Sequence, residues 1–147
     1  NENLSFSAGY AYTSTDVPQV VNPFNNIAQK VYILYTPENV GNVAMDYVLP
    51  VGFADLRLHL DATYADGAHS FEQFAQLTGS SCGVNGRPAL ADIEPGASQS
   101  LTLSLWSRNL LNEQHIYRRS EENRTTLGDY ANFNEPRTFG IEASVKY

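Results

Sequence analysis

Apolar and polar residues alternate strictly along several segments of this chain. In Ala54 to Ala65 the apolar side chains occupy every second position, namely Leu56, Leu58, Leu60, Ala62 and Tyr64. The positions between them carry Arg57, His59, Asp61 and Thr63. Because successive side chains of a strand point to opposite faces, the pattern predicts a β-strand with one apolar and one polar face.

The last ten residues, Thr138 to Tyr147, repeat this pattern. Their apolar positions are Phe139, Ile141, Ala143, Val145 and Tyr147. The opposite face carries Thr138, Gly140, Glu142, Ser144 and Lys146. We predict a strand here whose final aromatic residue is in register with its apolar face.

Alternation also predicts a strand over Leu4 to Thr13. Weaker alternation predicts two more, over Asn39 to Leu49 and Ser98 to Arg108. A sixth strand, about Val84 to Ile93, is inferred because a segment must join its neighbours. Trp106 interrupts the apolar face of its strand, so we expect its indole to point to the polar side or to lie at the rim, where its N–H finds a partner.

The connections between these strands alternate in length. Two are four-residue turns, Pro50 to Phe53 and Glu94 to Ala97, and three are long polar stretches, Ser14 to Glu38, Asp66 to Gly83 and Asn109 to Pro136. Short turns on one side and long loops on the other are typical of outer-membrane barrels. Aromatic residues also occur where the two rims would lie: Tyr10, Tyr12, Tyr64 and Phe139 outside, Phe53 and Tyr147 inside. We therefore predict an all-β fold, an antiparallel up-and-down transmembrane β-barrel segment of about six strands.

Composition excludes several other classes. Apolar residues reach 42%, charged residues only 17%, and the net charge of −7 argues against a nucleic-acid partner. Cys82 is the single cysteine, and the three histidines lack metal-ligand spacing. No nucleophile motif is visible either. We expect no cofactor, no metal and no catalytic residues, and we do not expect an enzyme.

Two motifs resemble those of a known family. Asn109-Leu110-Leu111-Asn112-Glu113 is similar to the Asn-Leu-apolar-Asp/Asn segment that follows the penultimate strand of TonB-dependent outer-membrane receptors. Glu135-Pro136-Arg137-Thr138-Phe139-Gly140-Ile141 is similar to the Pro-Arg-x-aromatic-Gly opening of their last strand, which ends in an aromatic residue, here Tyr147. The whole chain fits the last six strands of that family.

The resemblance implies a barrel of 22 strands around an N-terminal plug, located in the outer membrane of a Gram-negative bacterium. Such receptors import scarce nutrients, most often iron–siderophore complexes, and are driven by the TonB complex through a short N-terminal segment, the TonB box. We expect residues 1–147 to be the C-terminal portion of the barrel domain, with the plug and the earlier strands outside this chain. The expected partners are the rest of the barrel and the plug, the TonB complex, the barrel-assembly machinery, which reads the final strand as its signal, and lipid with lipopolysaccharide.

Two groups of charged residues are candidates for contacts with ligand or plug. They are the inward-facing Arg57, His59 and Asp61, and Arg118 and Arg119 in the last long loop. A cationic pair binds anionic groups well. The simpler interpretation is that the first group hydrates a barrel lumen and the second belongs to a solvated loop.

Three alternatives stay open from the sequence. A porin-like passive channel shares the strand pattern but has no plug. An outer-membrane hydrolase barrel needs acidic or Ser/His residues clustered at its outer rim. A soluble β-sandwich with a binding function also combines alternating strands with polar loops.

Overall fold

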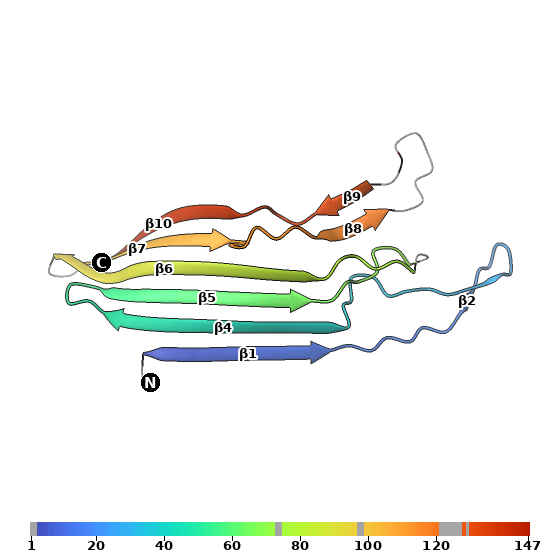
Figure 1. Ribbon diagram of the computed structural model, residues 1–147, viewed down its shortest axis with the longest axis horizontal. Coiled ribbons are helices and arrows are strands. Elements are labelled where there is room, and N and C mark those ends of the chain that lie inside the picture. The colour runs from blue at the N-terminus through green and yellow to red at the C-terminus, as the bar shows by residue number, and fades with distance from the viewer. Residues whose placement is uncertain (1–2, 73–74, 97–98, 121–127, 129) are drawn as a thin grey trace.

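The computed structural model describes residues 3–72, 75–96, 99–120, 128 and 130–147. Within them the chain is all-β without a helix, and six long strands form one antiparallel sheet (Figure 1). These strands are β1 (Leu4–Tyr12), β4 (Asn39–Pro50), β5 (Asp55–Ala65), β6 (Ser81–Gly96), β7 (Gln99–Arg108) and β10 (Thr138–Lys146). Each pairs with the next long strand of the chain, which gives an up-and-down order. The predicted all-β class and the antiparallel set of six strands are confirmed.

The strand inferred without a clear pattern differs most from its prediction. β6 has 16 residues and extends beyond the expected Val84 to Ile93 at both ends. It includes Gly96, which pairs with Gln99, so the predicted four-residue turn from Glu94 to Ala97 is wrong. Ala97 itself lies outside the described residues. Alternation is weak in β6 because glycines and a proline interrupt it, and two register shifts near its end add residues that a period of two cannot follow.

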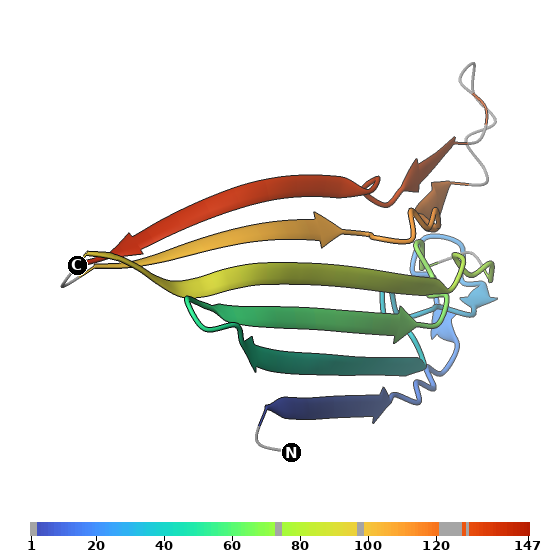
Figure 2. The same ribbon diagram turned by 60° about the vertical axis from the view of Figure 1, so that its left-hand side comes forward.

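The long connections contain short strands that the sequence pattern did not predict. β2 (Val20–Val21) pairs with β3 (Ala28–Gln29), and β8 (Ile116–Ser120) pairs with β9 (Tyr130–Phe133). Strands this short carry too few residues to show a period. Figure 2 shows these hairpins gathered beyond one end of a curved sheet, whereas the β4–β5 turn and the end of β10 lie at the other end.

The register places the apolar positions of all six strands on one face. Leu60 of β5 lies opposite Met45 of β4, and Leu103 of β7 lies opposite Leu90 of β6. Because a shift of one residue would turn a whole strand over, the hydrophobic pattern and the pairing specify each other. The sheet therefore has one continuous apolar face and one continuous polar face.

In the part of the chain that the structure describes, no second layer covers either face of the sheet. Within the described residues only Ala54 and Ala91 are buried apolar residues, with 7% and 2% of their surface exposed. β1 and β10 each pair with one strand only, so the sheet is open at both edges and forms no closed barrel by itself. The sheet thus lacks the core that a two-layer domain of this length would have.

The β4–β5 connection is as tight as predicted. Val51 N–H donates to the Ala54 carbonyl at 2.9 Å, and Gly52 has φ +87°, a conformation that glycine adopts without strain. The turn brings β4 and β5 into register from Pro50 and Asp55 onwards. It thereby aligns the charged positions of the two strands on the polar face.

Candidate functional site

A chain of polar contacts crosses the polar face at mid-height. The His59 Nδ1 atom lies 2.7 Å from Asp46 Oδ1 on β4, and its Nε2 atom lies 3.4 Å from Asp61 Oδ1. Asn85 of β6 donates from Nδ2 to Asp61 Oδ2 at 2.8 Å. With a proton on each nitrogen, the His59 ring donates towards both carboxylates and links β5 to β4, and the Asn85–Asp61 bond adds β6.

The contacts continue towards the last strand. Arg87 of β6 donates to Ser104 Oγ and to Glu142 Oε1, both at 3.1 Å, and so bridges β7 and β10. Trp106 of β7 lies beside this pair, and Arg108 stacks over its ring at 5.7 Å from the centroid. This places the Trp106 indole on the polar side, as predicted.

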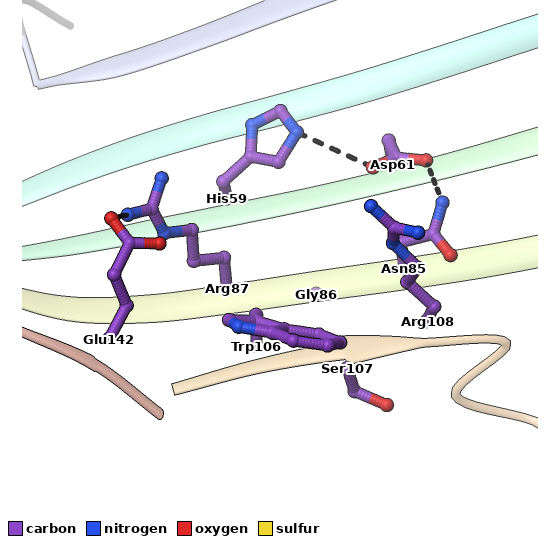
Figure 3. A pocket seen from close by; sticks show the side chains of 9 residues that line it. All are labelled: His59, Asp61, Asn85, Gly86, Arg87, Trp106, Ser107, Arg108 and Glu142. Carbon is purple, nitrogen blue, oxygen red and sulfur yellow. Dashed lines mark hydrogen bonds and ion pairs between the residues drawn. The ribbon is translucent and has the colours of Figure 1, made fainter. Parts of the chain in front are cut away.

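These side chains line an open polar hollow of about 350 Å³ (Figure 3). It is lined by His59, Asp61, Asn85, Gly86, Arg87, Trp106, Ser107, Arg108 and Glu142. The hollow offers donors, acceptors, both signs of charge and one aromatic ring. Exposed ion pairs contribute at most about 1 kcal/mol each to stability. This cluster therefore stabilises the sheet little, and its main effect is to make this part of the surface polar. Such a surface suits a polar ligand or a polar protein segment.

Of the predicted contact residues, His59 and Asp61 line the polar hollow, and Arg57 lines an adjoining hollow of about 520 Å³ together with His59. Arg57 lies two positions nearer the β4–β5 turn, where its guanidinium pairs with Asp92 and lies 3.8 Å from Asp55. The sequence analysis missed Asn85, Arg87 and Glu142 as members of the cluster. They occupy polar positions of their strands, but only the register shows that they meet.

Arg118 and Arg119 lie apart from the polar hollow, on β8. The Arg118 guanidinium stacks over Phe71 at 5.5 Å, and the Arg119 N–H donates to Ser70 Oγ at 3.2 Å. They therefore connect the last long connection to the one between β5 and β6. The charged residues that follow them in the sequence, Glu121, Glu122 and Arg124, lie outside the described residues.

The first family-like motif folds into a hydrogen-bonded corner at the loop end of β7. Asn109 and Asn112 have φ 49° and 55°, in the left-handed region that asparagine tolerates. The Asn109 amide donates to the carbonyls of Glu113 and Glu135 at 2.8 and 3.0 Å and accepts the Glu113 N–H at 2.9 Å. Its side chain thus joins the segments that precede and follow the β8–β9 hairpin.

The second family-like motif joins the same corner. Asn112 Oδ1 accepts the Arg137 N–H at 3.2 Å, and the Arg137 guanidinium reaches the Leu110 carbonyl at 3.4 Å. Pro136 precedes Arg137 directly and leads into β10. The two motifs, separated by about 20 residues of sequence, thus meet in space and set where the last strand begins.

Replacing Asn109 with alanine is expected to destabilise this corner by about 1–3 kcal/mol, because it removes three hydrogen bonds and an easily adopted left-handed conformation. Asn109→Gly keeps the backbone conformation and loses only the side-chain bonds, so it should cost less. The rate of hydrogen exchange at the Glu113 amide in the full protein would measure the loss of stability in both variants. Equal protection in the wild type and in Asn109→Ala would contradict the assignment.

A second hydrogen-bonded group, the tyrosine arch (Tyr10, Asn39, Asp66 and Tyr64), spans β1, β4 and β5 at their loop ends. Tyr10 Oη donates to Asn39 Oδ1 at 2.6 Å, and Tyr64 Oη donates to Asp66 Oδ1 at 2.8 Å. Asn39 Nδ2 donates to Asp66 Oδ2, as does the Asn39 backbone N–H at 3.1 Å. Asn39 of β4 therefore binds Tyr10 directly and is joined to Tyr64 through the Asp66 carboxylate.

The tyrosine arch should weaken at low pH. The side-chain hydrogen bond from Asn39, followed by that from Tyr64, lowers the pKa of Asp66 below its ordinary 3.8. A carboxylate whose pKa is lowered by folding contributes its full stabilisation above its ordinary pKa. This stabilisation is lost as the pH falls through the pKa of the folded state. We expect the Asn39 amide to lose hydrogen-exchange protection only below pH 3.8. In Asp66→Asn this pH-dependent step should disappear, and its persistence would exclude Asp66 as the cause.

Two kinds of site are not seen in the described part of the chain. It holds no cluster of three or more His, Cys, Asp or Glu residues arranged to bind a metal ion. It also holds no helix that is long and apolar enough to cross a membrane. The side chains that do cluster are those of the polar hollow, the corner and the tyrosine arch.

Comparison with known protein families, with curated proteins and with solved structures finds no match to this chain. The role of the chain must therefore be inferred from its own residues and their geometry. The strongest of these observations is the uncovered apolar face of the sheet.

Proposed function

We propose that the chain is the C-terminal barrel segment of a TonB-dependent receptor, which takes up iron–siderophore complexes actively across the outer membrane of a Gram-negative bacterium. The observation that carries this proposal is the apolar face, which is continuous over six strands and bears no covering layer. Exposed apolar patches of monomeric soluble proteins rarely exceed a few hundred Å². A lipid bilayer is the environment in which such a face is stable.

The exposure of individual side chains supports lipid contact. Phe6, Val43, Leu105 and Ile141 are spread from one edge of the sheet to the other, and their exposed fractions are 71%, 56%, 55% and 80%. Within the described residues, no second layer packs against these four side chains. In water these apolar side chains would stay hydrated, and burial of their surface would gain about 25 cal/mol for each Å² of apolar area.

Strand length and the ends of the sheet fit a membrane span. β5 has 11 residues, which at about 3.3 Å per residue and a tilt of about 45° cover roughly 25 Å, the height of the apolar band of a barrel. Tyr10, Tyr12 and Tyr64 lie at the loop ends of their strands, and Phe53 lies in the turn at the opposite end. Aromatic residues gather at these two levels in membrane barrels.

The open edges call for further strands. β1 and β10 each leave one row of backbone N–H and C=O groups without a strand partner within the described residues. In lipid such groups must be paired, and closure into a barrel pairs them. The partners we propose are therefore earlier strands of the same barrel, with a plug and the TonB complex acting through regions beyond this segment.

The polar face then lines the barrel lumen. The polar hollow provides hydrogen bonds and charges of both signs for a plug domain or a passing ligand. The corner formed by the two family-like motifs supports the assignment to receptors, because it gives both motifs a shared structural task. The final strand would serve the barrel-assembly machinery as its signal, with the apolar side formed by Phe139, Ile141, Ala143, Val145 and Tyr147.

Uptake by the intact parent protein tests the proposal. Cells carrying it should accumulate radiolabelled ferric hydroxamate or ferric catecholate chelates, and a protonophore should abolish the accumulation. A passive channel would continue to equilibrate small solutes in the presence of the protonophore. Uptake that is insensitive to the protonophore, or a parent chain that stays monodisperse in buffer without detergent, would overturn the proposal.

A further inference from the structure

The apolar face is not uniform, because a hollow of about 400 Å³ lies in it beneath the tyrosine arch. Tyr10 and Tyr64 flank Gly41 in one row across the sheet, since Tyr10 pairs with Gly41 and Gly41 pairs with Tyr64. The next row consists of Ala8, Val43 and Ala62. Glycine, two alanines and one valine thus form the floor, and the two tyrosine rings form the walls. We call this hollow the tyrosine slot.

The walls of the slot are held in place at its loop end. The Tyr10 hydroxyl donates to Asn39, and the Tyr64 hydroxyl donates to Asp66. Asn39 and Asp66 are hydrogen-bonded to each other across the end of the slot. The slot is therefore apolar along its length and closed by polar groups at one end. This is the distribution of polarity along a lipid molecule, from acyl chain to ester and head group.

The width of the slot selects among occupants. The backbones of Tyr10 and Tyr64 are two strand spacings apart, roughly 9.6 Å. An α-helix with its side chains is about 10–12 Å wide and does not fit between them. A single hydrocarbon chain does fit and would contact both rings and the alanines beneath.

We propose that the tyrosine slot binds one acyl chain of an outer-leaflet lipid, with the ester or head group of that lipid at the tyrosine arch. The inference rests on the proposed function, because it requires the apolar face to contact a bilayer. It goes further by naming one residue-specific lipid site on a face that otherwise contacts lipid without preference.

Gly41 provides a direct way to fill the slot. A Cβ atom added at Gly41 would meet only the Gly9 carbonyl oxygen, at 3.9 Å, which is an ordinary contact. Gly41→Leu is therefore compatible with the backbone, and its side chain would occupy the space proposed for the lipid. Leu105→Phe is the matched control, since it adds bulk on the same face in β7, away from the slot.

The experiment uses the full-length parent protein in vesicles of phosphatidylethanolamine and phosphatidylglycerol with a diazirine on the acyl chain. After irradiation, mass spectrometry should find lipid adducts concentrated on peptides that carry Tyr10, Tyr64 or Cys82, relative to the apolar-face peptides of β7 and β10. Gly41→Leu should lower these adducts about tenfold, which corresponds to about two methylenes of lost apolar contact. Leu105→Phe should leave them unchanged.

Even labelling over the whole apolar face, or labelling unaffected by Gly41→Leu, would overturn the slot while leaving the proposed function standing. A slot that stays unlabelled while the rest of the apolar face is labelled would overturn it in favour of another occupant. No labelling anywhere on the face would overturn both proposals. If Gly41→Leu fails to assemble, Ala62→Leu fills the slot from β5, and the wild-type labelling pattern remains decisive.

Discussion

Replacing Leu60 with arginine is expected to destabilise the folded protein by about 2–4 kcal/mol, the cost of arginine at the lipid-facing midplane of a barrel. Leu60 is the central residue of β5, lies on the apolar face and is 41% exposed. In the proposed orientation its side chain points into hydrocarbon, where a guanidinium loses its hydration. Urea titration of the full-length parent protein in phospholipid vesicles measures the change.

Leu56→Arg is the matched control, because it changes the same residue type on the same face of the same strand. Leu56 lies four positions nearer the β4–β5 turn, roughly 9 Å closer to the interface, where arginine costs only about 0–1 kcal/mol. A soluble two-layer domain predicts the opposite order, since Leu56 is less exposed than Leu60. A cost at Leu56 equal to or above that at Leu60 would contradict lipid contact.

The sequence predicted the strands best where a period of two was strict. β5 and β10 match their predicted segments to within one residue at each end. The end of β6 could not be predicted, because Asp92 adopts φ 54° within a stretch of shifted register, and a bulge leaves no trace in alternation. The all-β class and strand order thus follow from pattern, whereas irregularities depend on the three-dimensional pairing.

The polar hollow shows the same limit for the candidate site. Alternation placed His59 and Asp61 on a polar face, but it could not show that Arg87 meets Glu142, 55 positions later. That contact requires the registers of β6 with β7 and of β7 with β10, which turns and loops determine. Motif resemblance marked Asn109 and Arg137, yet only the structure shows that they share one corner.

Replacing Gly140 with alanine is expected to cost about 1–3 kcal/mol, as overpacking generally does. Gly140 pairs with Trp106 across β10 and β7. A Cβ atom at Gly140 would overlap the Trp106 atoms Cε2, Cζ2 and Nε1. The indole therefore lies over the glycine, and an alanine must displace it from the place where it lines the polar hollow. The loss falls on β10, an edge strand of the sheet, which would close the barrel in the proposed function.

Gly9→Ala is the matched control, since Gly9 is also on an edge strand and on the polar face. Its Cβ would meet the Asn42 Oδ1 atom at 2.5 Å, but that oxygen ends a rotatable side chain and can move aside. We expect a cost within about 0.5 kcal/mol, as for ordinary surface changes.

Trp106→Leu should relieve Gly140→Ala, because it removes the overlapping ring, and the two changes should show a coupling of about 1 kcal/mol or more. Urea titrations of the four proteins in vesicles measure this cycle. Additive effects would mean that the indole does not occupy the space above Gly140, and that β10 is held to β7 by backbone pairing alone.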